Sequence, residues 1–124
     1  MTIILHITTR SQWHHAEKLG EYRADSLASE GFMHCSVPTQ IPGVVHRFFQ
    51  GQTDLLLLCI DSTLVQAELR YDAIATGEKF PHIYGALNLD AVVQVVEFHP
   101  DPTREVTLPQ AVTELCRNAL NDSV

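Results

Sequence analysis

Several features that define whole classes of proteins are scarce or missing in this chain of 124 residues. It has three cysteines, an odd number at wide spacing with no C-x-x-C pair. This argues against a disulfide framework and a structural zinc site, so Cys35, Cys59 and Cys116 are predicted to be free thiols, mostly buried. The longest apolar run, Leu55 to Ile60, is far too short to span a bilayer, so no membrane role is expected.

Basic residues are also few. Eight lysines and arginines stand against fifteen acidic residues, which gives a net charge of −7, and the basic residues are scattered singly. Binding of duplex nucleic acid is therefore not expected. A single small nucleotide or metabolite remains compatible, because a cleft can be locally positive on an acidic protein. The sequence leaves the oligomeric state open.

Recognisable catalytic motifs are missing as well. The sequence contains no glycine-rich phosphate loop, no H-E-x-x-H zinc motif and no G-x-S-x-G turn that would expose a nucleophilic serine. A Ser/His/Asp triad built from Ser26 or Ser36 with His34 or His82 is accordingly disfavoured. The first residues lack the basic region of a signal or transit peptide, so a cytoplasmic location is expected.

What is present is the composition of one ordinary globular domain, residues 1–124, with 45% apolar and 19% charged residues. Residues 2–8 alternate as a strand that places Ile3, Leu5 and Ile7 on one face and His6 and Thr8 on the other. The next helix is expected to be capped by Thr9 or Ser11 and to end at Gly20.

Further strands are predicted at residues 31–36, 55–60, 67–71 and 91–98, with 55–60 central because it is apolar throughout. A helical stripe at residues 41, 44, 45 and 48 ends at Gly51, and a last helix at about 108–121 begins with Pro109. Pro81 assigns residues 80–85 to an edge or irregular segment. The irregular mixture of elements indicates an α+β fold.

Three of these segments place an imidazole beside a hydroxyl on one strand face: His6 with Thr8, His34 with Ser36, and His82 with Tyr84. A shared cleft is a hypothesis, since no spacing rule brings distant strands together. Three imidazoles could also bind zinc, with Asp72 or Glu78 as an outer partner. The adjacent pair His14 and His15 is interpreted as helix surface.

Three segments carry a resemblance: residues 6–9 (HITT), 22–36 (YRADSLASEGFMHCS) and 80–85 (FPHIYG). From about residue 3 to 98 the chain resembles the bacterial domain-of-unknown-function family 952. That family is similar in fold to ADP-ribosyltransferase-like domains, in which two small, mostly antiparallel sheets with flanking helices surround a cleft. In active relatives the cleft holds NAD, which here would be a substrate, with no cofactor otherwise implied.

The resemblance also implies roles for individual residues. His6 matches the first-strand residue that grips a ribose, and Ser36 or Tyr84 would position a second ribose. Asp72 or Glu30 would stabilise the cationic sugar, although a glutamate is expected in place of Asp72, and Glu30 could instead pair with Arg23. The predicted catalytic residues are thus His6, Asp72 and Glu30, and the predicted substrate-binding residues are Thr8, Arg23, Ser26, His34, Ser36, His82 and Tyr84.

Three functions follow from these observations. The first is a cleft for NAD or an ADP-ribose-like nucleotide, with ADP-ribosyl or related transferase activity. The second is a module that binds a small metabolite without turnover. The third is a zinc-dependent hydrolase that uses His6, His34 and His82. Chelator-resistant nucleotide binding separates the first two from the third.

Overall fold

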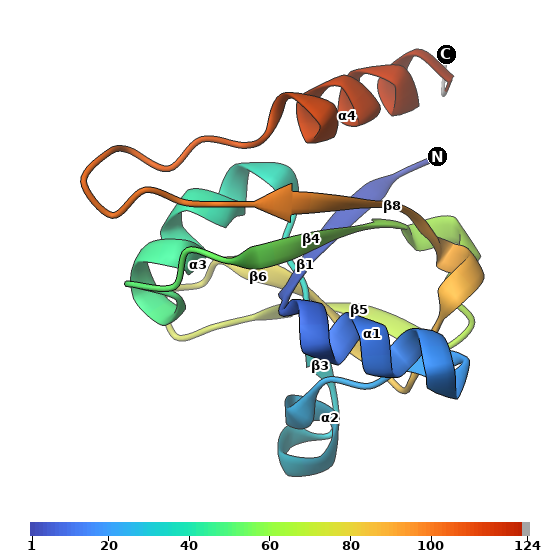
Figure 1. Cartoon of the computed structure of the whole chain (residues 1–124). Coiled ribbons are helices and arrows are strands. Elements are labelled where there is room, and N and C mark those ends of the chain that lie inside the picture. The colour runs from blue at the N-terminus through green and yellow to red at the C-terminus, as the bar shows by residue number, and fades with distance from the viewer. Residues whose placement is uncertain (123–124) are drawn as a thin grey trace.

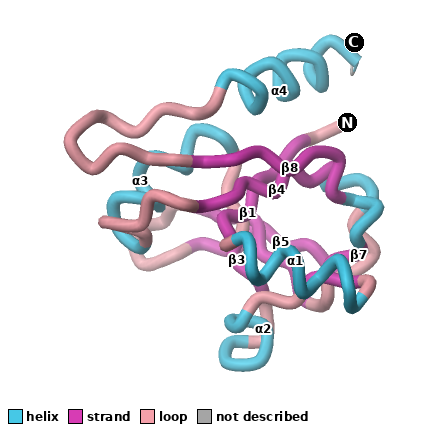
Figure 2. Tube along the Cα trace, in the orientation of Figure 1, coloured by secondary structure: helices cyan, strands magenta, loops and turns pink. Residues whose placement is uncertain are grey.

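The computed structural model describes residues 1–122 and has an α+β fold. Every strand pair in this part of the chain is antiparallel. The strands form two three-stranded sheets and one two-stranded ribbon, and the helices lie around the outside (Figure 2).

The first sheet has the strand order β1-β4-β8, with β1 at Ile3–Thr8, β4 at Leu55–Asp61 and β8 at Val92–Phe98. The apolar β4 is buried at all seven positions and occupies the centre, as the sequence predicted. Because successive side chains alternate between faces, β1 sends Ile3, Leu5 and Ile7 to one side and His6 to the other.

The second sheet has the order β3-β6-β5, with β3 at Met33–His34, β6 at Lys79–Tyr84 and β5 at Glu68–Ala73. The prediction that Pro81 marks an edge strand is wrong, because β6 is central. The Pro81 carbonyl accepts a hydrogen bond of 2.9 Å from the Cys35 amide. In an antiparallel strand the backbone N–H and C=O of one residue point to the same neighbouring strand, which for Pro81 is β3. Proline has no N–H, but β3 ends at His34, so the absent donor of Pro81 faces a position just beyond that strand.

A two-stranded ribbon pairs β2 (Glu21–Tyr22) with β7 (Leu87–Asn88). The predicted strand at residues 31–36 is reduced to β3 and one isolated bridge between Leu5 and Ser36. Short 3-10 turns η1 (Pro38–Gln40), η2 (Ser62–Leu64) and η3 (Leu89–Ala91) connect these elements.

Four α-helices complete the fold: α1 (Arg10–Leu19), α2 (Asp25–Glu30), α3 (Ile41–Phe48) and α4 (Gln110–Asp122). The Thr9 side chain caps α1, and Gly20 ends it in the left-handed conformation with φ of 91°, as predicted. The sequence did not predict α2. Within the described residues 1–122, no helix combines the length and apolarity needed to cross a membrane.

The first sheet is buried on both faces by two separate apolar clusters. On one face, Ile41 and Val45 of α3 and Val112 and Ala119 of α4 pack with the odd-numbered residues of β1 and β4. On the other face, α1, the β2-β7 ribbon and the second sheet contribute the packed side chains. Figure 1 shows α4 beyond β8, on the opposite side of the sheet from α1 and α2. The polar face of β1 is therefore directed between the two sheets.

Candidate functional site

A cleft of about 630 Å³ opens where β1 ends, between the second sheet and α3. Its wall combines imidazoles and hydroxyls with apolar side chains, and its size lies within the range of roughly 300–1,000 Å³ that is typical of small-molecule sites. The lining residues that the sequence predicted as site residues are His6, Thr8, Ser26, Glu30, His34, Ser36 and His82. The three histidines therefore share one site.

His6 is held from both ring nitrogens. Its Nδ1 lies 2.6 Å from the His34 carbonyl, which can only accept, so Nδ1 carries a proton. Burial lowers the pKa of His6 to about 4, so the ring is neutral at pH 7. The Tyr22 hydroxyl lies 2.8 Å from Nε2 and 2.9 Å from Thr8 Oγ1, and it connects the two. The same burial raises the pKa of Tyr22 to about 12.

This arrangement limits the role that the resemblance implied for His6. A ribose hydroxyl could reach either ring nitrogen only by displacing the Tyr22 hydroxyl or the His34 carbonyl. In the structure His6 positions the Tyr22 and Thr8 hydroxyls along the cleft wall. The Gln12 side chain, 2.9 Å from the Thr8 hydroxyl, extends this chain of polar groups.

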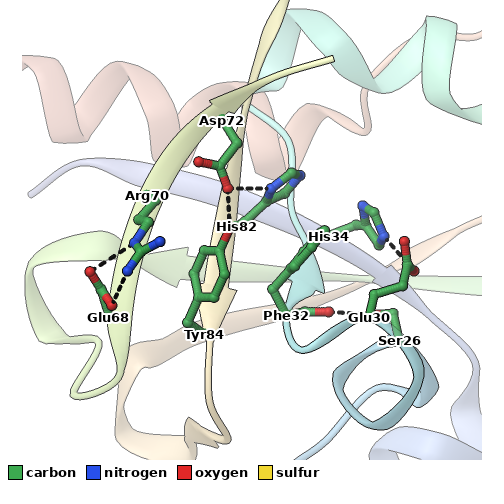
Figure 3. Close-up of polar contacts among 9 residues, drawn as sticks. All are labelled: Ser26, Glu30, Phe32, His34, Glu68, Arg70, Asp72, His82 and Tyr84. Atoms are coloured by element: carbon green, nitrogen blue, oxygen red, sulfur yellow. Dashed lines mark hydrogen bonds and ion pairs between the residues drawn. The ribbon is translucent and has the colours of Figure 1, made fainter. Parts of the chain in front are cut away.

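Two further histidines pair with carboxylates (Figure 3). His34 Nε2 lies 2.9 Å from Glu30 Oε2, and His82 Nδ1 lies 2.9 Å from Asp72 Oδ2. The two pairs differ in burial, because the His34 side chain is 53% exposed and that of His82 only 6%. The Glu30–His34 pair is a surface contact at the rim, whereas His82 is fixed inside the wall.

The contact with Asp72 defines the tautomer of the buried His82 ring. Asp72 Oδ2 also accepts the Tyr84 hydroxyl. The hydrogen bonds from Tyr84 and His82 lower the pKa of Asp72, and the bond to Asp72 raises the pKa of Tyr84. An ionised carboxylate only accepts, so His82 donates from Nδ1 and the lone pair of the neutral ring lies on Nε2. His82 lines the cleft, and none of the hydrogen bonds found among residues 1–122 engages its Nε2.

The Phe32 ring fixes the orientation of these groups. It stacks on the His82 ring with centroids 4.2 Å apart and meets the His34 ring edge-on at 5.0 Å. The Ser26 hydroxyl donates to the Phe32 carbonyl over 2.8 Å and thereby fixes the backbone of this segment (Figure 3). Aromatic packing of this kind restricts an imidazole to one rotamer.

Three predicted site residues lie outside the cleft lining: Arg23, Asp72 and Tyr84. Arg23 pairs with Glu21 on the surface, and Glu30 pairs with His34 in place of Arg23. Asp72 and Tyr84 are one step removed from the cleft, where they hold His82. As the sequence analysis expected, His14 and His15 are exposed and Cys35 is buried; burial raises the pKa of the Cys35 thiol to about 12.

Sequence reasoning missed two lining residues that matter chemically, Arg47 and Phe48. Phe48 was placed on the packed stripe of the helix, but its side chain is 69% exposed. Only Ile41 and Val45 of that stripe are fully buried, while Val44 and Phe48, four residues apart on α3, border the cleft. Some residues of the stripe therefore pack in the core and others line the cleft, and periodicity alone cannot tell the two apart.

A zinc centre formed by the histidines finds no support in the geometry. Among residues 1–122, no three histidine, cysteine or acidic side chains are grouped so that they could hold a metal ion. The reason lies in the local contacts. The ring nitrogens of His6 are bound to His34 and Tyr22, and the backbone places His34 and His82 edge to face, with ring centroids 5.2 Å apart.

The family model described as "Protein of unknown function (DUF952)" matches residues 7–95. The chain belongs to this family. The match contains β1 from Ile7, the β3 and β6 segments that carry His34 and His82, and α3. No curated protein matches the chain.

The solved structures that match this fold are of protein CC0527 from Caulobacter crescentus. Its crystal structure has a TM-score of 0.80 and 26% identity, covering 90% of this chain and 99% of CC0527, and a double mutant of CC0527 gives the same values. The solution structure of CC0527 has a TM-score of 0.72 and 28% identity, covering 83% and 90% of the two chains. The fold of this chain is thus shared along nearly the whole of CC0527.

Proposed function

We propose that the cleft binds a nucleotide of the NAD or ADP-ribose type. The observation that carries this proposal is the combination of groups at the cleft mouth: the guanidinium of Arg47 and the exposed ring of Phe48 lie beside a wall of imidazoles and hydroxyls. A nucleotide offers matching parts, since it has a flat base, anionic phosphates and ribose hydroxyls.

The rim suits the base and the phosphates. A phenylalanine ring with 69% of its surface in water has unused apolar area, and stacking a base on such a ring is worth roughly 1–3 kcal/mol. Arg47 is adjacent in sequence, and its only ion pair within residues 1–122 is a long contact of 3.6 Å with Glu78. An exposed pair of this length contributes little, so phosphate oxygens can replace the carboxylate.

The wall suits the sugar. The hydroxyls of Thr8 and Ser36 and the His82 ring line the same cleft as Arg47. Ribose hydroxyls both donate and accept, so they fit a surface that offers hydroxyls and an imidazole lone pair. The two small antiparallel sheets beside a cleft are also the arrangement implied by the resemblance to ADP-ribosyltransferase-like domains. The choice of the NAD class among nucleotides rests on this fold-level resemblance.

Binding is tested by isothermal titration calorimetry of the full chain with ADP-ribose, NAD, nicotinamide mononucleotide and AMP, each with and without EDTA. We expect saturable, EDTA-resistant binding of ADP-ribose, weakened at least tenfold in Arg47→Gln and in Phe48→Ala. Replacing Tyr71, which is exposed and lies outside the cleft lining, with alanine provides the matched control and should leave the affinity unchanged. If none of the four nucleotides binds, the proposal is refuted.

A further inference from the structure

The Asp72–His82 pair has the geometry of a general base that faces the cleft. We propose that His82 Nε2 takes a proton from a water molecule that attacks the N-glycosidic carbon of an NAD-type ligand, with Asp72 as the positioning residue. The substrate class in this inference rests on the proposed function. The role of His82 as a base is argued from its own contacts.

The contacts of His82 favour proton acceptance. Its Nδ1 donates to Asp72 over 2.9 Å, so the Nε2 lone pair is available to the cleft. The carboxylate also stabilises the imidazolium that forms when the proton is taken. Stacking on Phe32 and burial of all but 6% of the side chain hold the ring in place, so no reorganisation is needed at the moment of proton transfer.

The groups around the His82 ring have complementary charges. The titratable and charged side chains that face it or its partners are Asp72 and Arg70 from β5, Tyr84 from β6, His34 from β3 and Glu30 from α2. The Arg70 guanidinium lies over the Tyr84 ring at 4.6 Å and is held by Glu68. Tyr84 donates to the same oxygen of Asp72 as His82, which keeps the carboxylate ionised.

The attacking group is inferred to come from solution because, among residues 1–122, no protein hydroxyl is hydrogen-bonded to His82 Nε2, although the Ser36 hydroxyl lines the same cleft. The Ser26 hydroxyl is committed to the Phe32 carbonyl. Among residues 1–122, none of the side-chain hydrogen bonds that His82 makes is to a serine. A histidine with a carboxylate partner and no protein nucleophile activates a water molecule or another small hydroxyl acceptor.

The proposed step balances in atoms and charge. The water oxygen forms a bond to the anomeric carbon of the ribose while the bond from that carbon to the pyridinium nitrogen breaks. The electron pair of the broken bond stays on the nitrogen, which leaves as neutral nicotinamide. The water proton passes to His82 Nε2 and then to solvent, so the products are ADP-ribose, nicotinamide and one proton. Glu30, at the cleft rim, supplies negative charge toward the cationic sugar.

The test measures nicotinamide release from NAD by the full chain between pH 5 and 9, together with ADP-ribose affinity. We expect release by the wild-type chain, whose pH profile is the reference for the variants. His82→Gln should reduce release roughly 100-fold or more, the contribution typical of a general base, and this loss should be much larger than any loss of ADP-ribose affinity. His14→Gln, an exposed histidine outside the cleft, is the control.

Two more variants separate catalysis from folding. Asp72→Asn should lower release and change the pH profile, since an amide no longer fixes the Nδ1–H tautomer. His82→Ala should regain part of its release when imidazole is added, which a misfolded protein would not do. Binding of ADP-ribose without nicotinamide release, or full release by His82→Gln, would overturn this inference and leave the proposed binding function intact. Absence of binding by all four nucleotides would instead refute the proposed function.

Discussion

The charge of His6 is controlled by the environment that folding creates around a single residue. An imidazole in water has a pKa near 6.5, whereas burial among packed side chains lowers the pKa of His6 to about 4. Folding thus fixes a neutral ring whose Nδ1 proton points at the His34 carbonyl. The sequence placed His6 on the polar strand face but could not show that this face would be covered by the second sheet.

A pH-dependent stability follows from this residue. Between pH 4 and 6.5 the unfolded chain binds the His6 proton more readily than the folded chain, so the free energy of unfolding rises with pH across this window. The stability is fully present above pH 6.5 and falls by up to about 3 kcal/mol as the pH drops through the window. Urea unfolding at pH 7, 5.5 and 4.5 measures the change.

A variant pair isolates the contribution of His6. His6→Asn keeps a donor near the place of Nδ1 but cannot titrate, so its loss of stability between pH 7 and 4.5 should be smaller than that of the wild-type chain by about 2 kcal/mol. The exposed His14→Gln should behave like the wild type. Equal pH dependence in all three proteins would contradict the assignment. The stability that ionised Asp72 contributes is present above its ordinary pKa of 3.8 and is lost as the pH falls from there through its lowered pKa.

At the scale of single elements, local chemistry explains where the helices begin and end. The Thr9 cap and the left-handed Gly20 of α1 were both readable from the sequence, because capping depends on residues next to each other in the chain. The position of β6 was not readable, since Pro81 is tolerated in a central strand only because β3 ends beside it. That condition belongs to a neighbouring strand more than forty residues away in the chain.

Two glycines of similar exposure should respond in opposite directions to a methyl group. Gly20 has φ of 91°, where an L side chain is strained, so Gly20→Ala should destabilise the fold by roughly 1–2 kcal/mol. Gly43 lies inside α3, where an added Cβ would meet only Arg47 Nη2, at an ordinary 3.8 Å. Gly43→Ala should therefore stabilise by about 0.5–1 kcal/mol. Chemical denaturation of both variants checks the pair, and a shift of the same sign in both would be inconsistent with this account.

At the scale of the whole molecule, the last helix completes the core. The apolar stripe of α4 packs on the domain itself. Val112 is fully buried against the first sheet together with residues of β1, β4 and α3. The helix thus covers the face of the first sheet opposite the site.

Removing that packing should weaken the whole fold. Val112→Ala deletes two buried methyl groups' worth of apolar contact and should lower the free energy of unfolding by about 2 kcal/mol. Glu114→Ala, on the exposed side of the same helix, should change it by less than about 0.5 kcal/mol. Urea unfolding of the two variants compares them directly. An unchanged midpoint in Val112→Ala would mean that α4 does not contribute to the cooperative core.

The sequence by itself determined the α+β class, the central position of the apolar β4, the caps of α1, and the polar face that carries His6 and Thr8. These depend on periodicity and on neighbours in the chain, which local physical chemistry governs. Only the tertiary structure decided that three histidines share one cleft, that Asp72 holds His82, and that Phe48 is exposed beside Arg47. Those facts depend on contacts between segments distant in the chain, which are set by the packing of two sheets and by no sequence spacing.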